Sequence, residues 1–139
     1  MDTTALAMEI ALDTPYEEAL DQVAAALKEN GFGVLTKIDV KETLKEKLDV
    51  DFRKYSILGA CNPKLANRAL GARGDVGLML PCNVTVEESD GGSLVRIADP
   101  NVMLGVGGFD DDPELAAVAS EARALLAKAA ATLAGEPNG

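Results

Sequence analysis

The sequence predicts an α+β domain in which one antiparallel five-stranded sheet carries two long helices on one face. Two observations predict this fold class. Five segments have strand-like apolar patterns, and a long helical pattern follows the first of them and another follows the last. Elements in the order strand, helix, four strands, helix favour a layered α+β arrangement. With two short helices inserted between strands, residues 1–139 form a single domain.

The first strand and the first long helix lie at the N-terminus. Residues 5–12 place their larger apolar side chains at every second position, which is a strand pattern. A helix follows, with Thr14 as its expected N-cap and Pro15 at its first position. Glu17 completes a capping box with Thr14, and Gly31 suits the left-handed conformation that ends many helices.

A second strand and a short helix come next. Residues 32–40 form a strand-like run, and residues 41–48 place two leucines one helical turn apart. Asp39 lies directly before this short helix and is a residue type that caps helix N-termini.

The third strand leads into a second short helix. Residues 54–61 form the strand, and residues 62–71 form the helix. Asn62 is a suitable N-cap, and Pro63 has the fixed φ that favours the first helical position. The strand is therefore expected to end at Cys61, at the start of a helix.

The fourth and fifth strands form a hairpin. Residues 75–89 predict one long strand that is interrupted at Pro81, where a missing N–H favours a bulge or a sheet edge. The sequence SDGGS at 89–93 predicts a tight turn, and residues 94–99 form the fifth strand.

The C-terminal part predicts a Gly-rich loop and then the second long helix. Residues 100–111 have no periodic pattern, whereas Asp112 and Pro113 are typical of a helix start. The tail at 135–139 is expected to fray. The expected buried stripe of the helix consists of Leu115, Val118, Ala122, Leu125, Ala129 and Leu133.

Composition excludes several classes of function. The net charge of −10 argues against binding to nucleic acid and against binding to anionic membranes. Histidine is absent, which excludes Ser-His and Cys-His triads and zinc sites with histidine ligands. We expect no cofactor and no metal. Because no residue before Lys28 is basic, we also expect no signal peptide, a cytoplasmic protein and reduced cysteines.

One face of the predicted sheet has no helices to cover it. Strand alternation assigns small or apolar residues to this face, and an uncovered apolar face usually marks a partner interface. We therefore expect a homodimer, with Leu58 and Met79 as interface candidates. The residues assigned to this face are Ala5, Ala7, Ala11, Ser56, Leu58, Ala60, Gly77 and Met79.

Cys61 and Cys82 are the candidate thiol site. Cys61 lies at a helix N-terminus, whose partial positive charge favours a thiolate, so it is expected to be the more reactive of the two. The alternative for Cys61 is a small buried residue at the end of a strand. Cys82 is expected on the same strand face as Val84 and Val86, which favours a core position for it. The alternative is that Pro81 turns Cys82 outward.

A simple meander keeps the two thiols apart. It pairs Cys61 with Val76 or Gly77, which leaves Cys82 on the order of 15–20 Å away at about 3.3 Å per residue. This separation is beyond the reach of a disulfide, unless the two strands pair with a large offset. Two thiols also fall short of the four ligands of a tetrahedral metal site within one chain.

Three residues near the thiols are candidate ligand-binding residues: Asn62, Arg73 and Pro81. Arg73 lies in a Gly-flanked turn, where it could hold a carboxylate or phosphate, or could instead pair with Asp75. The GVGG sequence at 105–108 lacks the features of a phosphate loop.

Four segments resemble a known bacterial and archaeal family. IDVKETLKEKL, YSILGACNPKLANRAL, VGLMLPCNVTVEE and DPELAAVASEARALLAKA together resemble the family called domain of unknown function 302, from about Leu6 to Leu133. The Cys-containing blocks GACNP and LPCNV are the most specific parts. The resemblance implies a small α+β domain with the topology of a TATA-binding-protein repeat, and a homodimer, but no established reaction.

Three hypotheses about function remain open. The first is a non-enzymatic, homodimeric binding module with a small-ligand pocket near Cys61 and the Pro81–Cys82 turn. The second is a thiol-based redox, sulfur-transfer or soft-metal protein that uses both cysteines. The third is a structural role in which both cysteines belong to the core.

Overall fold

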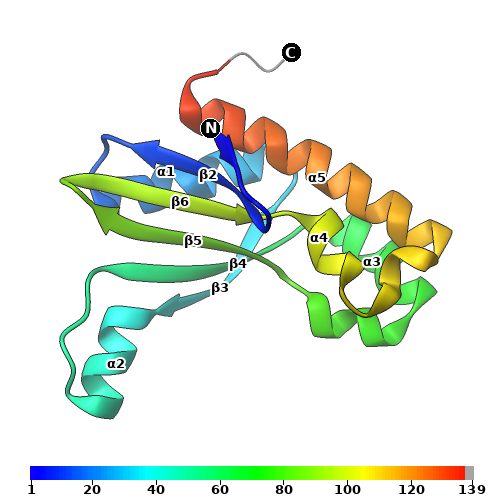
Figure 1. The fold of residues 1–139 in the computed structure, drawn as a ribbon, viewed down its shortest axis with the longest axis horizontal. Coiled ribbons are helices and arrows are strands. Elements are labelled where there is room, and N and C mark those ends of the chain that lie inside the picture. Colours follow the sequence, from blue (N-terminus) through cyan, green and yellow to red (C-terminus); the bar gives the residue numbers. More distant parts are fainter. Residues whose placement is uncertain (137–139) are drawn as a thin grey trace.

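A computed structural model describes residues 1–136. It is an α+β fold whose antiparallel sheet has six strands in the order β1-β2-β6-β5-β4-β3 (Figure 1). The strands are β1 (Asp2–Thr3), β2 (Ala7–Leu12), β3 (Gly33–Asp39), β4 (Tyr55–Cys61), β5 (Cys82–Ser89) and β6 (Gly92–Ala98).

The predicted number of five strands is wrong because β1 adds a sixth. Its two residues pair with β2, at Asp2–Glu9 and Thr3–Met8. A turn at Thr4 folds β1 back, and the Thr4 hydroxyl accepts hydrogen bonds from the backbone of Leu6 and Ala7. A two-residue strand is too short to show any alternation of side chains, so the sequence carries no pattern for it.

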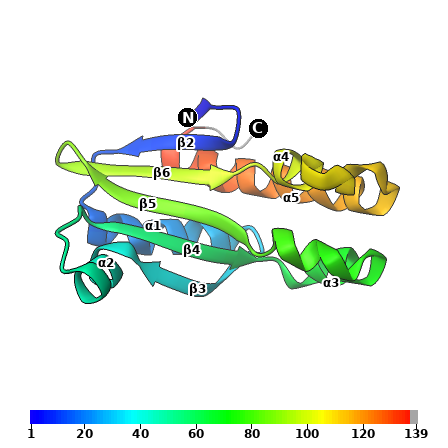
Figure 2. The same ribbon diagram turned by 60° about the horizontal axis from the view of Figure 1, so that its bottom comes forward.

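Two long helices lie side by side on one face of the sheet, as predicted (Figures 1 and 2). They are α1 (Tyr16–Glu29) and α5 (Pro113–Ala134). Asp112 caps α5 by accepting from the backbone N–H of Leu115, and Gly31 follows α1 with a φ of 84°.

The N-cap expected for α1 is wrong. Pro15 precedes the helix without a side-chain cap, and the Thr14 hydroxyl instead lies 3.5 Å from the side-chain oxygen of Gln22. Since Pro15 has no backbone N–H, the start of this helix has one fewer donor to satisfy.

The core forms between these helices and the sheet. Leu115, Val118, Ala122 and Ala129 of the predicted α5 stripe are buried, whereas Leu125 and Leu133 are only partly buried. Leu126, outside the predicted stripe, is fully buried. The largest fully buried side chains of the domain are Met8, Ile10, Val23, Leu27, Val76, Val84, Val86, Val95, Ile97, Leu115 and Leu126.

The two predicted short helices and their N-caps are confirmed. In α2 (Val40–Leu48) the side chain of Asp39 accepts from the backbone N–H of Glu42 at 3.0 Å. In α3 (Pro63–Ala72) the side chain of Asn62 accepts from the backbone N–H of Leu65 at 3.2 Å. None of the residues of α2 is buried.

The predicted long strand over 75–89 is wrong in its first half. Residues Gly74–Met79 form a 3-10 helix, η1, and the strand β5 begins only at Cys82. The Leu80–Pro81 peptide bond between them is cis. Neither the bulge nor the sheet edge expected at Pro81 is present, because Pro81 precedes β5, which lies between β6 and β4. A register irregularity lies instead in β3, between Val34 and Thr36.

The predicted loop over 100–111 also contains helical structure. Asp99 caps the helix α4 (Pro100–Gly105) by accepting from the backbone N–H of Asn101. The 3-10 segment η2 (Val106–Asp111) follows and includes Gly107 and Gly108, both with positive φ. The sequence did not predict this helical segment, because glycines interrupt its apolar pattern.

The predicted uncovered face is wrong in β4. Ser56, Leu58 and Ala60 are buried beneath the helices, and Leu58 is only 2% exposed. The hydroxyl groups of Tyr16 and Ser56 hydrogen-bond in this interior. Alternation places these three residues on one face, but does not say which face the helices cover. Leu58 therefore cannot be an interface residue, and Met79 lies in η1, half-buried against the core.

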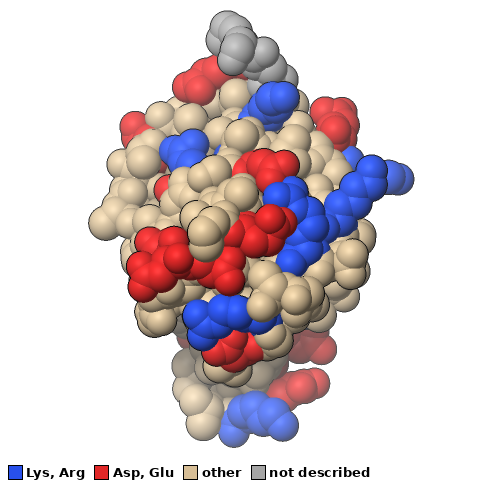
Figure 3. All heavy atoms as spheres, turned by 90° about the vertical axis from the view of Figure 1, so that its right-hand side faces the viewer, with Lys and Arg blue, Asp and Glu red and all other residues tan. Residues whose placement is uncertain are grey.

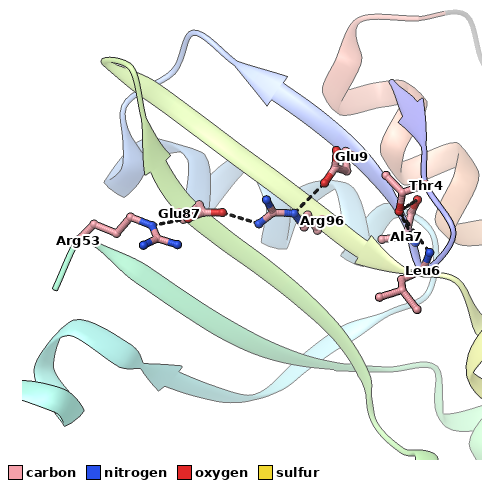
Figure 4. A network of polar contacts seen from close by, with 7 residues as sticks. All are labelled: Thr4, Leu6, Ala7, Glu9, Arg53, Glu87 and Arg96. Carbon is pink, nitrogen blue, oxygen red and sulfur yellow. Dashed lines mark hydrogen bonds and ion pairs between the residues drawn. The ribbon is translucent and has the colours of Figure 1, made fainter.

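The uncovered face of the sheet instead carries a network of charged side chains. Figure 4 shows Glu87 between Arg53 and Arg96, with Arg96 also donating to Glu9 at 2.7 Å. Burial acts to raise the pKa of Glu87, but the hydrogen bonds from Arg53 and Arg96 outweigh it and hold that pKa below its usual range. This face is a charged surface at its centre, not an apolar one.

Within residues 1–136, no helix combines the length and the apolar character that crossing a bilayer requires.

Candidate ligand-binding site

A cavity of about 470 Å³ lies at the end of the sheet where β4 leads into α3 and η1 leads into β5. In Figures 1 and 2 this is the end of the molecule that carries α3 and α4. The lining comes from the strands and from four helical segments. The lining residues are Phe32, Leu35, Thr36, Ala60, Cys61, Asn62, Leu65, Ala66, Ala69, Leu70, Leu78, Met79, Leu80, Pro81, Cys82, Asn83, Ala98, Pro100, Met103, Leu104, Val118, Ala119 and Ala122.

The strand register brings both predicted cysteines to this cavity. Cys82 pairs directly with Ala60 in the antiparallel β4–β5 ladder, so Cys61 is only one residue beyond the partner of Cys82. The predicted separation on the order of 15–20 Å is therefore wrong, because it assumed a continuous meander. The η1 helix takes up residues Gly74–Met79 and lets β5 start opposite the end of β4.

Burial of Cys82 makes its thiol harder to ionise. Burial, and to a smaller extent the charge of a Cys61 thiolate, raises the pKa of Cys82 to about 11. At neutral pH Cys82 is therefore a neutral thiol, with the character of a small apolar residue. Its strand position beside buried Val84 and Val86 agrees with the alternation seen in the sequence.

Because Gly59 has no side chain, two lining residues, Thr36 and Pro81, pack closely against β4 at this position. A Cβ atom at this position would lie 2.2 Å from Oγ1 of Thr36 and 2.7 Å from Cγ of Pro81. Both distances are far shorter than van der Waals contact, so only glycine leaves room for these two side chains. Thr36 and Pro81 are both lining residues of the cavity.

The two walls of the cavity differ in polarity. The walls from α3, α4, α5 and η1 are made only of apolar side chains. The strand side carries Thr36, Asn62 and Asn83 together with the two thiols. None of the lining residues is charged, and all of them lie within the described part of the chain.

Asn62 has a structural task as well as a place in the lining. Its Oδ1 accepts from the backbone N–H of Leu65 and so caps α3. Its Nδ2 makes no hydrogen bond within residues 1–136, and neither do the side chains of Thr36 and Asn83. These polar groups therefore have no hydrogen-bond partner within the described part of the chain.

Arg73 does not line the cavity. Its guanidinium donates two hydrogen bonds to the carboxylate of Asp75 and lies 4.6 Å from the ring centre of Phe109. The second of the two predicted roles, the ion pair with Asp75, is the one that the structure contains. Arg68 is likewise paired, with Glu114 and Glu121, and Figure 3 shows acidic and basic side chains interspersed over this end of the molecule.

The acidic run at 110–112 has a local role. Asp112 caps α5, as the sequence indicates. Within residues 1–136, no group of three or more histidine, cysteine or acidic side chains is arranged to hold a metal ion.

Sequence reasoning missed the helical wall of the cavity. Met103 and Leu104 belong to α4, which the sequence did not predict, and Val118, Ala119 and Ala122 looked like ordinary core positions of α5. One signal was present: alanines at helical spacing in both α3 and α5 leave space where larger residues would have filled it. The alanines concerned are Ala66, Ala69, Ala119 and Ala122.

Comparison with known proteins identifies the family of this chain. A family model described as domain of unknown function DUF302 matches residues 8–133. The chain belongs to the DUF302 family. It is also similar to the crystal structure of an uncharacterized conserved DUF302 protein from Bacillus stearothermophilus. The two share 30% identity and a TM-score of 0.81, over 91% of this chain and 97% of that one. A comparison with curated proteins finds no match.

Proposed function

We propose that this DUF302 domain is a non-enzymatic binding module that holds a small molecule in the cavity beside Cys61 and the Pro81–Cys82 turn. The observation that carries the proposal is the cavity itself, about 470 Å³ in volume, with an apolar wall and a few polar groups. Cavities of roughly 300–1,000 Å³ with this mixture are typical small-molecule sites.

The lining favours binding over catalysis. Its polar groups are two thiols, two amides and one hydroxyl, and none of these is placed beside a general base. Acid–base and nucleophilic catalysis both need such a group within hydrogen-bond reach.

Chemical-shift mapping with a fragment mixture tests the proposal. Fragments that bind should shift backbone amide signals of Ala66, Ala119 and Asn83, which lie on three sides of the cavity. Ala66→Trp should fill the cavity and abolish these shifts, whereas Ala72→Trp, on the same helix but outside the lining, should leave them unchanged. Shifts that cluster elsewhere, or none at all, contradict the proposal.

We also propose that the protein forms a homodimer, through the β3 edge of the sheet. Support comes from β3, an edge strand with an exposed apolar side chain outside the cavity: Ile38 is 50% exposed. An edge strand presents unpaired backbone groups to which a second chain can add. The neighbouring helix α2 buries none of its residues within the chain.

Light scattering tests the dimer. We expect a dimer mass at micromolar concentration and a monomer mass for Ile38→Lys. Leu6→Lys is the matched control, because Leu6 is also exposed, at 62%, but lies near the opposite edge of the sheet. A monomer mass for the unchanged protein overturns this part of the proposal.

A second candidate function is thiol chemistry: redox, sulfur transfer or soft-metal handling by Cys61 and Cys82. It is favoured by one observation, that both thiols line the same cavity. The raised pKa of Cys82, about 11, leaves Cys61 as the thiol that would react first. Rapid alkylation of Cys61 in the folded protein would support this function, and slow alkylation of both thiols would contradict it.

A further inference from the structure

We infer that the ligand of this cavity is an uncharged, mainly apolar molecule that carries a hydrogen-bonding group on one edge. The inference rests on the proposed binding function and deepens it by naming the class of ligand. Three features of the cavity carry it: the lack of charge in its lining, the unpaired polar groups on its strand side, and the leucines at its mouth.

Charge is the first feature. No lysine, arginine, aspartate or glutamate is among the lining residues, so a charged ligand would find no side chain of opposite charge in the lining. A buried charge without a partner is strongly unfavourable. Two arginines at this end are already engaged, Arg68 with Glu114 and Glu121, and Arg73 with Asp75. Lys37 and Lys64 adjoin lining residues in sequence but are not themselves part of the lining. The net charge of −10 adds a long-range repulsion against anions.

Hydrogen bonding is the second feature. Thr36, Asn62 and Asn83 all lie on the strand side, and their free polar groups include the Nδ2 of Asn62. The helical part of the lining is apolar throughout, with Leu65, Met103 and similar residues. A ligand that fits both walls has an apolar body and a carbonyl, hydroxyl or amide on one edge.

The mouth of the cavity is the third feature. Leu35, Leu70 and Leu78 are lining residues and yet are 69%, 46% and 84% exposed. They come from β3, α3 and η1, so exposed apolar surface approaches the cavity from three elements. Exposed apolar groups that gather around a cavity favour an apolar ligand, because its entry removes them from water.

A pair of fluorescent probes tests the charge requirement. N-phenyl-1-naphthylamine is uncharged, and 8-anilino-1-naphthalenesulfonate has the same rings with one sulfonate added. We expect saturable binding of the uncharged probe, at least tenfold tighter than binding of the sulfonate. Ala66→Trp should abolish this binding and Ala72→Trp should preserve it. Chemical-shift mapping on the unchanged protein locates the probe without relying on a variant.

Each outcome separates the inference from the proposed function. If the sulfonate binds in the cavity as tightly as the uncharged probe, the cavity binds ligands but the inferred class is wrong. If neither probe nor any fragment shifts the lining residues, the proposed function fails, and the inference fails with it.

A second probe pair tests the hydrogen-bonding edge. The compounds 2-acetylnaphthalene and 2-ethylnaphthalene have similar shapes, but only the first has a carbonyl acceptor. We expect the acetyl compound to bind at least threefold tighter and to shift the side-chain amide signals of Asn62 and Asn83. Equal affinities would overturn the hydrogen-bonding part of the inference.

Discussion

Replacement of Gly59 by alanine tests the close packing that builds the strand side of the cavity. The new Cβ atom would lie 2.2 Å from Oγ1 of Thr36 and 2.7 Å from Cγ of Pro81. The threonine hydroxyl can rotate away, although β-branched residues have few alternative rotamers. The proline ring cannot, because its atoms are tied to the main chain. Gly59→Ala therefore requires a movement of the chain at Pro81, next to Cys82.

The expected cost follows from these contacts. Overpacking of this kind destabilises proteins by about 1–3 kcal/mol. Alanine recovers roughly 0.5–1 kcal/mol, because glycine loses more backbone entropy on folding. We expect a net loss of about 1–2 kcal/mol in the free energy of unfolding. At an m-value of about 2 kcal/mol/M, the urea midpoint should fall by roughly 0.5–1 M.

Urea denaturation with a matched glycine variant provides the assay. Gly33 lies in β3 with no heavy atom within 4 Å of its would-be Cβ, so Gly33→Ala should be neutral or stabilising. A double-mutant cycle with Thr36→Ala should recover part of the Gly59→Ala loss, with a coupling of at least about 0.5 kcal/mol. If Gly59→Ala is as stable as Gly33→Ala, or if Thr36→Ala recovers nothing, the described packing is wrong.

Three further predictions concern the charged network, the buried thiol and a helix cap. Glu87→Gln should lower stability at pH 7 by about 1–3 kcal/mol. Because the pKa of Glu87 is lowered on folding, its contribution is present above about pH 4.3 and is lost as pH falls through the lower folded value. The two proteins should thus converge in stability as pH falls through the folded pKa of Glu87, and a difference in urea midpoint that stays constant into the acid range would contradict this. In the Cys61→Ser variant, the rate at which iodoacetamide alkylates Cys82 should rise about tenfold per pH unit from pH 8 to 10, because the pKa of Cys82 is about 11. A rate that reaches a plateau below pH 9 would refute the raised pKa. Asn62→Ala should cost about 0.5–2 kcal/mol in thermal or urea unfolding, and Asn62→Asp, which keeps a capping oxygen, should restore most of it.

Much of the secondary structure could be predicted because it depends on local contacts. Asp39, Asn62 and Asp112 each cap a helix by accepting from a backbone N–H only two or three residues away. The alternation in β5 likewise places Val84 and Val86 in the core. Such short-range hydrogen bonds and periodicities are fully specified by neighbouring residues.

Segment 74–81 could not be predicted, since its apolar residues suit either a strand or a helical turn. Tertiary packing decides between them: Val76 is fully buried in η1. The choice has a large effect on the site. A strand here would separate the two thiols, whereas the 3-10 helix starts β5 opposite Ala60 and brings Cys82 beside the end of β4.

The sequence by itself determined the α+β class, the family and the N-caps of α2, α3 and α5. Only the tertiary structure decided which sheet face the helices cover, and it buried Leu58 where an interface was expected. It also enclosed the cavity, whose walls come from residues as distant as Phe32 and Ala122. The physical reason is that alternation defines two faces without distinguishing them, and a cavity exists only between side chains that the chain brings together from far apart.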